Sequence, residues 1–404
     1  HRHNVFRYFH IKQFIKSKGA IASIFMGIFY AVAMLGIFLP GYTALPGNMD
    51  ELKIALVNDD KGEAGAQIAT QLQESLPFKE IDTDLTNKKA LKELEKNEYA
   101  LVIHIPENFS EDAQSGKGTN IDFTVNEASA TMVSSAMSSV VTEINKQLST
   151  SCSQQTAQGI LMQFNVPEEQ AKELATQIEN SYTGNYVVMN DVPNGMHNNM
   201  LPMFITMASY VGAMIAAMQL VGSFKANRGK ASKTRLFIYV QLTALIIAIL
   251  SMVATLIISF SITDIDLDIL LPVAGQQILV YMAAFNLCAI PIFLVGEGGM
   301  ILNIPILLMQ TLANGATMPR DMMYAPYEWM SYISPMYYSV QAYLSTMFGS
   351  ISPTPYILGL VAVCLGAMLI NALIAAFLHK PLPVDEVEIE VEIVKSTQSS
   401  EITA

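Results

Sequence analysis

Residues 236–262 read LFIYVQLTALIIAILSMVATLIISFSI and contain no charged side chain. The hydrocarbon core of a bilayer is about 30 Å thick, and about 20 apolar residues of α-helix cross it. This stretch is therefore long enough to span a membrane as one helix. Other uncharged apolar stretches occur at residues 20–39, 201–224, 269–295, 300–316 and 356–378. The sequence predicts an α-helical membrane protein with six transmembrane helices.

The composition of the whole chain agrees with a membrane protein. Hydrophobic residues make up 51% of the 404 residues and charged residues only 14%, with a mean hydropathy of +0.35. A soluble domain carries about 25% charged residues. The net charge is −12, and the lack of a basic excess excludes a nucleic-acid partner. Only three cysteines occur, which excludes a disulfide framework.

The positions of lysine and arginine orient the predicted helices. Basic residues accumulate in residues 1–19 and in the loop 225–235, and such segments stay on the cytoplasmic side. The loop 263–268 instead carries three aspartates and no base. We therefore expect a multi-pass plasma-membrane protein whose two termini, including the tail 379–404, are cytoplasmic. Residues 40–200 then form one extracellular domain.

The segment 40–200 has the pattern of an α/β domain. It carries 23 acidic and 10 basic residues, so we expect its surface to be acidic. Apolar runs bounded by turn residues predict strands, and apolar residues at helical spacing predict helices between them. The predicted strands are Leu52–Val57, Tyr99–Ile105 and Ile121–Val125, and the predicted helices are Ala64–Leu76 and Asn87–Lys96. Two long helices that stand on the membrane are expected between Ser129 and Tyr182, the second beginning at Pro167.

The sequence contains no recognisable catalytic or metal-binding motif. A P-loop needs the spacing GxxxxGK[ST], and the two nearest matches, at residues 116–119 and 228–231, lack the upstream glycine and a preceding strand. The six histidines are scattered, without a carboxylate or a second histidine at ligand spacing. We therefore expect a protein that is not an enzyme and holds no cofactor of its own.

Two stripes of side chains in the predicted helices suggest a path for a substrate. One stripe lies on the helix 300–316 and consists of Asn303, Gln310 and Asn314, whose amides lipid cannot hydrogen-bond. The other lies on the helix 201–224 and consists of Met203, Met207, Tyr210 and Met214. Methionine-rich faces are adaptable and suit promiscuous apolar binding. Two alternatives stay open: the amides bond only to other helices, and the methionines only face lipid or a neighbouring helix.

The predicted cytoplasmic side has two features that suit a docking partner. In residues 1–19, aromatic and aliphatic residues are interleaved with bases, as in an amphipathic helix in contact with membrane lipids. The loop 225–235 is short and joins two helices. Its basic residues are Lys225, Arg228, Lys230, Lys233 and Arg235. The general rule that cytoplasmic loops are basic explains the same charges without a partner.

The order of these elements resembles that of a known family. The predicted order is an interfacial helix, one span, a large outer domain and a five-span block with a basic loop after its first helix. This order resembles that of the ABC type-2 exporter permeases. The resemblance is greatest to the branch that includes the phage infection protein family. The residues that carry it are IALVNDDKG at 54–62, YALVIHIPENFS at 99–110, Leu201-Pro202, Asn314-Gly315 with Pro319, and Trp329 with ISPMYY at 333–338.

The resemblance implies a bacterial homodimer or a pair of related permeases, with a separate ATP-binding subunit that docks on the cytoplasmic helix and loop. It also implies short outer helices within residues 317–355 that dip back toward the membrane. The function it favours is export of a lipophilic or amphipathic compound, with ATP bound by the partner subunit. Another class of function stays open: a membrane receptor or scaffold, such as a phage receptor or a secretion-system accessory, that acts through its outer domain without transport.

Overall fold

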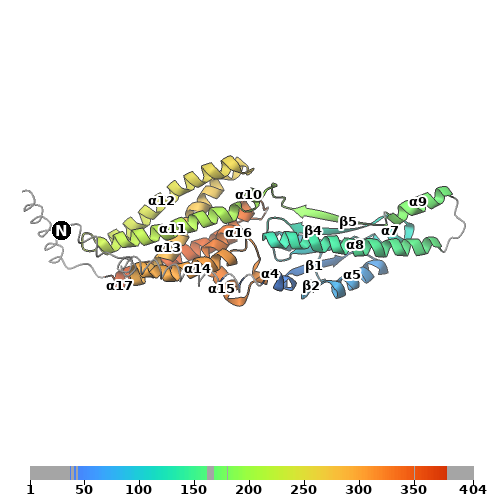
Figure 1. Cartoon of the computed structure of the whole chain (residues 1–404), viewed down its shortest axis with the longest axis horizontal. Coiled ribbons are helices and arrows are strands. Elements are labelled where there is room, and N and C mark those ends of the chain that lie inside the picture. Colours follow the sequence, from blue (N-terminus) through green and yellow to red (C-terminus); the bar gives the residue numbers. More distant parts are fainter. Residues whose placement is uncertain are drawn as a thin grey trace, which may run out of the picture.

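The structure is elongated, with a helical block at one end and a sheet with its helices at the other (Figure 1). This computed structural model describes residues 37, 41, 44–161, 168–179, 181–349 and 351–379. The predicted amphipathic helix 1–19 lies outside the described residues. So do all of the predicted span 20–39 except Ile37, and all of the tail 379–404 except His379.

Long apolar helices form the helical block. They are α11 (Leu201–Ala226), α12 (Lys233–Ile262), α13 (Leu270–Val295), α14 (Met300–Ala313) and α17 (Thr354–Phe377). By length and composition, the described residues contain four helical segments able to cross a membrane, and one of them, Leu267–Ala313, holds both α13 and α14. These segments confirm a multi-pass helical protein. The number of six helices stays a prediction, because the first predicted span is not described.

The chain reverses direction between α13 and α14. The 3-10 helix η3 (Gly296–Gly299) joins them, and Gly296 has a φ of +78°, a conformation that favours glycine. Asn303 Nδ2 of α14 donates to the Cys288 carbonyl of α13 at 2.9 Å. In one continuous helix, two residues with this separation of 15 positions would lie about 22 Å apart. The two helices therefore fold back on each other.

α14 is shorter than the span 300–316 predicted from the sequence. It ends at Ala313, because Gly315 adopts a φ of +78° that turns the chain out of the helix. Its 14 residues reach about 21 Å, less than the ~30 Å of a bilayer core. The segment after it contains α15 (Ala325–Ile333) and α16 (Pro335–Met347), and α16 is buried against α11, α13 and α17. Whether these short helices dip into the membrane stays a prediction.

A five-stranded mixed sheet forms the centre of the α/β domain. Its strands are β1 (Lys53–Asn58), β2 (Glu80–Asp82), β3 (Leu101–Ile105), β4 (Thr119–Asn126) and β5 (Tyr182–Met189). Their order is β2-β1-β3-β4-β5, and every neighbouring pair is parallel except β3 and β4. The three predicted strands are confirmed as β1, β3 and β4. The prediction missed β2, which has only three residues, and β5, an edge strand that exposes most of its side chains.

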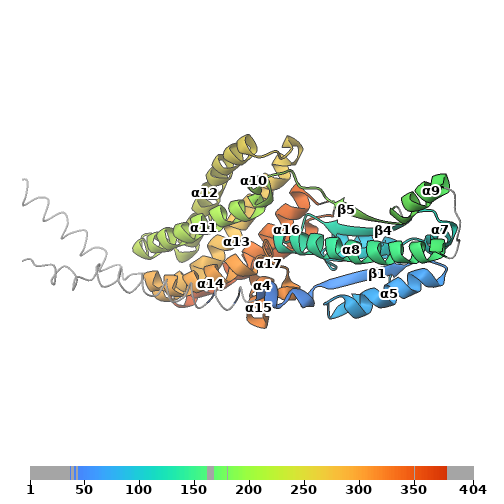
Figure 2. The ribbon, with the colours of Figure 1, turned by 45° about the vertical axis from the view of Figure 1, so that its right-hand side comes forward.

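Helices cover both faces of the sheet. They are α5 (Glu63–Ser75), α6 (Asn87–Glu95), α7 (Phe109–Ser115), α8 (Thr131–Leu161) and α9 (Glu168–Glu179). Successive residues of a strand point to opposite faces, so Ile54 and Leu56 of β1 lie in one core and Ala55 and Val57 in another. α5, α7 and α8 pack on the first face, and α6 on the second. Figure 2 shows α5 and α8 running along the sheet, with α9 at the end far from the helical block.

The α/β domain and the helical block share one core. Apolar side chains of the sheet and of α8 form a continuous cluster with Leu312, Met322 and Tyr327 of the block. The Thr131 amide at the start of α8 also donates to the Ala316 carbonyl at 2.9 Å. The domain is therefore seated directly on the end of α14 and the segment that follows. The remaining short elements are α4 (Ala44–Gly47), η1 (Met49–Glu51), α10 (Met196–Asn199), η2 (Leu267–Ile269) and η4 (Arg320–Met322).

Candidate functional site

The predicted substrate path lies where α11 meets α14. Gln310 Nε2 of α14 donates to the Tyr210 hydroxyl of α11 at 2.7 Å, and Gln310 Oε1 accepts a hydrogen bond from Ser334 Oγ at 2.8 Å. All three side chains are fully buried. Ser334 is the residue that caps the start of α16. Gln310 therefore links α11, α14 and α16 through buried hydrogen bonds.

The other two amides of the stripe also face protein. Asn303 Nδ2 donates to the Cys288 carbonyl at 2.9 Å. Asn314 Oδ1 accepts from the Ala316 amide at 2.9 Å, while Asn314 Nδ2 has no hydrogen-bond partner among the described residues. Each amide thus bonds within the chain, as expected for polar groups that lipid cannot satisfy. Whether a substrate also contacts them stays a prediction.

The methionine stripe of α11 reaches the same contact between helices. Thr311 Oγ1 of α14 lies 3.9 Å from Met207 Sδ, as a weak hydrogen bond to sulfur. Met214 is buried in the core of the block, and Met203 is half-buried. The two predicted stripes are therefore brought together within one chain, at Met207 and Tyr210. A second copy is not needed for this contact.

A further buried polar network, which the sequence analysis missed, crosses the helical block. Gln241 Nε2 of α12 donates to Asn286 Oδ1 of α13 at 2.8 Å, and Asn286 Nδ2 donates back to Gln241 Oε1 at 3.2 Å. Asn371 Nδ2 of α17 donates to the Asn286 carbonyl at 2.7 Å. Amides within apolar stretches are the signal for such a network. Their pairing becomes visible only when the three helices are packed.

The basic loop 225–235 is fastened to the ends of two other helices. Lys225 Nζ donates to the Ile292 carbonyl near the end of α13 at 2.8 Å. Lys233 Nζ donates to the Ala376 carbonyl at the end of α17 at 3.1 Å. Carbonyls in the last turn of a helix favour a nearby cation, and the Ile292 carbonyl accepts the Gly296 amide as well as Lys225. These two lysines therefore hold the loop against the block.

The other bases of the loop have different surroundings. Arg228 Nε donates to the Lys225 carbonyl at 3.1 Å and so closes the end of α11. Lys230 and Arg235 are exposed, and their side chains form no hydrogen bond or ion pair with another described residue. Lys230 and Arg235 are thus the bases of this loop available to a partner.

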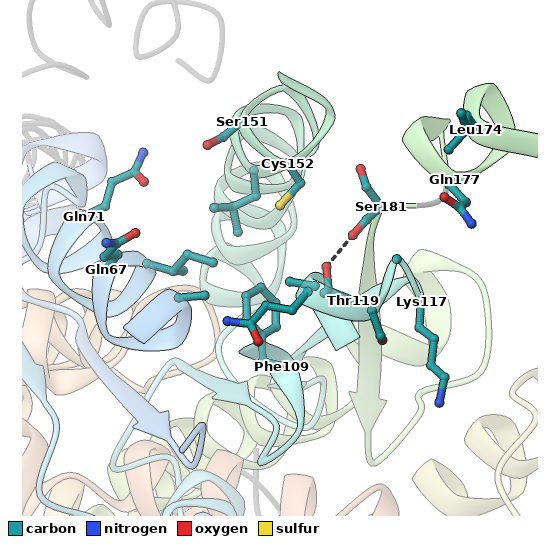
Figure 3. Close-up of a pocket in the computed structure, with 17 residues that line it drawn as sticks. Gln67, Gln71, Phe109, Lys117, Thr119, Ser151, Cys152, Leu174, Gln177 and Ser181 are labelled. Carbon is teal, nitrogen blue, oxygen red and sulfur yellow. Dashed lines mark hydrogen bonds between the residues drawn. The ribbon is translucent and has the colours of Figure 1, made fainter. Parts of the chain in front are cut away.

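A separate pocket opens in the α/β domain among α5, α7, α8 and α9, and Figure 3 shows the side chains that line it. It has a volume of about 420 Å³, and its wall is mostly uncharged and polar, with amides such as those of Gln67 and Gln177. The Thr119 hydroxyl donates to the Ser181 carbonyl across this wall. Burial raises the pKa of the Cys152 thiol, which keeps the sulfur protonated and a poor nucleophile. Among the described residues, no group of His, Cys, Asp and Glu could hold a metal ion.

The arrangement of spans and α/β domain corresponds to a known family along most of the chain. The sequence model described as ABC-2 family transporter protein matches residues 20–378. The chain belongs to the ABC-2 transporter family. The resemblance to the ABC type-2 permeases is thereby confirmed at the level of the family.

This ABC-2 chain is similar to two other proteins over part of its length. It is 31% identical over 111 residues to the uncharacterised protein YhgE of Bacillus subtilis, and the match covers 25% of this chain and 14% of YhgE. A solved domain of a candidate ABC type-2 transporter from Thermotoga maritima matches with 16% identity and a TM-score of 0.25. That match covers 34% of this chain and 86% of the domain. The chain thus spans only a small part of YhgE.

Proposed function

We propose that this ABC-2 permease exports a lipophilic or amphipathic compound from a bacterial cell, driven by ATP that a separate subunit binds and hydrolyses. The observation that carries the proposal is the basic loop 225–235, which is bonded to the ends of α13 and α17 while Lys230 and Arg235 stay exposed. A subunit that moves this loop acts directly on the helices of the block. Membership of the ABC-2 family favours transport over the receptor or scaffold function.

The loop suits mechanical coupling because it is short and held from both sides. Lys225 and Lys233 bind carbonyls of helices that are distant in the sequence, so a displacement of the loop is transmitted to α13 and α17 as well as to α11 and α12. Lys230 and Arg235 can pair with acidic groups of an ATP-binding subunit, which fixes its orientation. The predicted amphipathic helix 1–19 is proposed as the second docking element.

Charge reversal at the exposed positions tests this docking site. The double variant Lys230→Glu with Arg235→Glu should insert into the membrane normally, because the bases before the first predicted span still orient the chain. It should lose the ATP-binding subunit on affinity purification, and with it export. A matched control reverses two exposed lysines of the α/β domain, Lys88→Glu with Lys146→Glu, and should keep both. Normal association and export in the first variant would refute docking at the loop.

The substrate path is proposed along the contact between α11 and α14. Tyr210, Gln310 and Asn314 supply polar groups there, and Met207 adds a polarisable apolar surface. An amphipathic substrate needs an apolar surface with a few polar anchors. Asn314 Nδ2 is the one donor of the stripe that is still unbonded among the described residues, and it would be the first to bond a substrate when the helices separate.

A second copy of the chain, or a related permease, is proposed to complete the transporter. α12 exposes Leu250 and Ile257, each 64% accessible, and α17 exposes Leu369, 61% accessible. In a membrane such faces are covered by lipid or by a partner helix. Light scattering of the detergent-purified transporter gives the copy number. A single copy in a preparation that exports and binds the ATP-binding subunit would exclude the dimer.

The proposed orientation places the α/β domain outside the cell and the basic loop 225–235 inside. It rests on charge, because residues 40–200 carry 23 acidic and 10 basic residues whereas bases cluster in the loop. The ATP-binding subunit then reaches the loop from the cytoplasm.

A further inference from the structure

A cavity of about 470 Å³ lies at the junction of the α/β domain and the helical block. One wall comes from β1 and the connection between α6 and β3, and the other from the segment after α14, from α15 and α16, and from the start of α17. The volume is within the range of roughly 300–1,000 Å³ that is usual for small-molecule sites. Its lining includes neither the Tyr210–Gln310 pair nor the basic loop, so its ligand does not depend on the proposed function.

An arginine without an acidic partner is fixed in the wall of this junction cavity. The Arg320 guanidinium lies between two aromatic rings, 3.9 Å from the Tyr332 centroid and 3.8 Å from the Tyr337 centroid. Arg320 Nε donates to Ser331 Oγ at 2.8 Å, and Nη2 donates to the Ser331 carbonyl at 3.3 Å. These bonds use two of its five N–H donors, and Arg320 forms no ion pair with a described residue. A charged, rigidly held fork thus faces the cavity.

Two buried polar side chains of α16 also line the junction cavity with unused bonding capacity. Tyr337 is only 9% exposed, and its hydroxyl forms no hydrogen bond with another described residue. Gln341 is 8% exposed, and with the other described residues its side chain makes one long hydrogen bond, from Nε2 to the Asn314 carbonyl at 3.4 Å. The Tyr337 hydroxyl and the remaining amide atoms of Gln341 can therefore bond a ligand or ordered solvent in the cavity.

Three carboxylates line the same cavity, beside Arg320 and two lysines. They belong to Glu98, Asp321 and Glu328, and none of them forms an ion pair with a described residue. Both lysines of the lining already pair with glutamates outside it, each at 3.9 Å. Burial raises the pKa of Asp321; Lys53 opposes this rise, and Glu98 and Glu328 add to it. A bound cation would relieve this repulsion.

We propose that the junction cavity binds a group that carries both a phosphate and a primary amine. The phosphate contacts the Arg320 guanidinium, whose planar fork matches phosphate oxygens, and accepts a hydrogen bond from the Tyr337 hydroxyl. The ammonium donates its three N–H bonds among the carboxylates of Glu98, Asp321 and Glu328. A zwitterion therefore uses both signs of charge that the cavity offers.

The surroundings of the junction cavity indicate a membrane lipid as the source of this group. α15, which supplies one wall, exposes Trp329 to 68% and Tyr332 to 51%. Exposed tryptophan and tyrosine are enriched at the level of lipid headgroups. The junction lies at the C-terminal end of α14 and the N-terminal end of α17, where the helical block meets the α/β domain. The fitting lipid is an aminophospholipid of the leaflet next to that domain.

Lipid retention by the full chain tests this assignment. The protein is placed in nanodiscs of phosphatidylethanolamine, phosphatidylcholine and phosphatidylglycerol in equal amounts, extracted, and its bound lipids are identified by native mass spectrometry. The native chain should retain phosphatidylethanolamine in preference to the other two. Arg320→Gln should reduce this retention about tenfold, because a charge-assisted pair is lost. Arg320→Lys should lose less, and the matched control Lys146→Gln nothing.

A second variant keeps the test decisive if Arg320→Gln does not fold. Asp321→Asn preserves the shape of the side chain and should lower the retention of phosphatidylethanolamine to that of phosphatidylcholine, whose amine has no N–H to donate. Displacement of the lipid by soluble glycerophosphoethanolamine would show that the headgroup alone is recognised, and resistance to displacement would assign the lipid as the source. Equal retention of the three lipids by the native chain, or unchanged retention in Arg320→Gln and Asp321→Asn, overturns the proposal.

Discussion

The hydrogen bonds around Gln310 lead to a quantitative prediction for the helical block. Replacing Gln310 by Leu keeps a similar apolar volume between α11 and α14 but removes the bonds to Tyr210 and Ser334, which measure 2.7 and 2.8 Å. All three side chains are fully buried, so water cannot replace the lost partners. The two hydroxyl groups then remain in an apolar contact with fewer bonds.

The expected cost follows from the number of short side-chain bonds between helices that each variant removes. Gln310 also makes two longer bonds, to the Ile306 carbonyl of its own helix at 3.2 Å and from the Met336 amide at 3.5 Å, which are left out of this count. Hydrogen bonds between membrane helices contribute about 0.6 kcal/mol on average and at most about 1.7 kcal/mol. Gln310→Leu should therefore lower the free energy of unfolding by about 1.2 kcal/mol, or about sevenfold in the equilibrium constant. Tyr210→Phe removes one of the same bonds and should cost about 0.6 kcal/mol. The double variant should cost about 0.6 kcal/mol less than the two single variants together, because they share that bond.

Reversible unfolding in mixed micelles, followed by circular dichroism, measures this coupling energy. Tyr210→Phe combined with Gln219→Leu, an exposed amide of the same helix, is the matched control and should be additive. Additivity of Tyr210→Phe with Gln310→Leu to within about 0.3 kcal/mol would refute the bond between them. Export assayed in Gln310→Leu separates the two roles of the stripe. Unchanged export would make the amide a purely structural link and would place the substrate path elsewhere.

Orientation, energy source and path can each be tested. In a background without native cysteines, single cysteines are placed at the exposed positions Asp84, Asp266 and Ala226, and intact cells are treated with an impermeant thiol reagent. The reagent should label the cysteine at Asp84 or Asp266 and not the one at Ala226. Labelling at Ala226 would contradict the proposed orientation. The purified chain should not hydrolyse ATP, because it lacks P-loop spacing; phosphate release by a pure sample would contradict this. Replacing Met207 and Met214 by Ala should change which compounds are exported, in a resistance assay, more than the amount of protein in the membrane. Unaltered selectivity would remove the methionines from the path.

Local patterns in the sequence were sufficient for the elements that depend on near neighbours. α11, α12, α13 and α17 begin and end within three residues of the predicted spans. β1, β3 and β4 also follow from apolar runs bounded by turn residues. The periodicity of a helix or strand is set by residues a few positions apart, so it can be read without the fold.

The missed elements depend on partners that are distant in the chain. β5 pairs with β4 in a register that joins Thr119 to Tyr182, and its outward side chains, such as Val187 at 43% exposure, show no buried alternation. The predicted fifth span ended at residue 316, whereas Gly315 turns the chain after Ala313. In both cases the hydrophobicity of the segment was compatible with more than one structure, and tertiary contacts decided between them.

The sequence alone was enough to predict a multi-pass membrane protein with an α/β domain, because hydropathy and helical spacing are local properties. Only the tertiary structure decided which atoms meet. Gln310 bonds to Tyr210 across 100 positions, and Arg320 is enclosed by the rings of Tyr332 and Tyr337. Such contacts depend on how the helices pack and on how the α/β domain sits on them, and no local pattern contains that information.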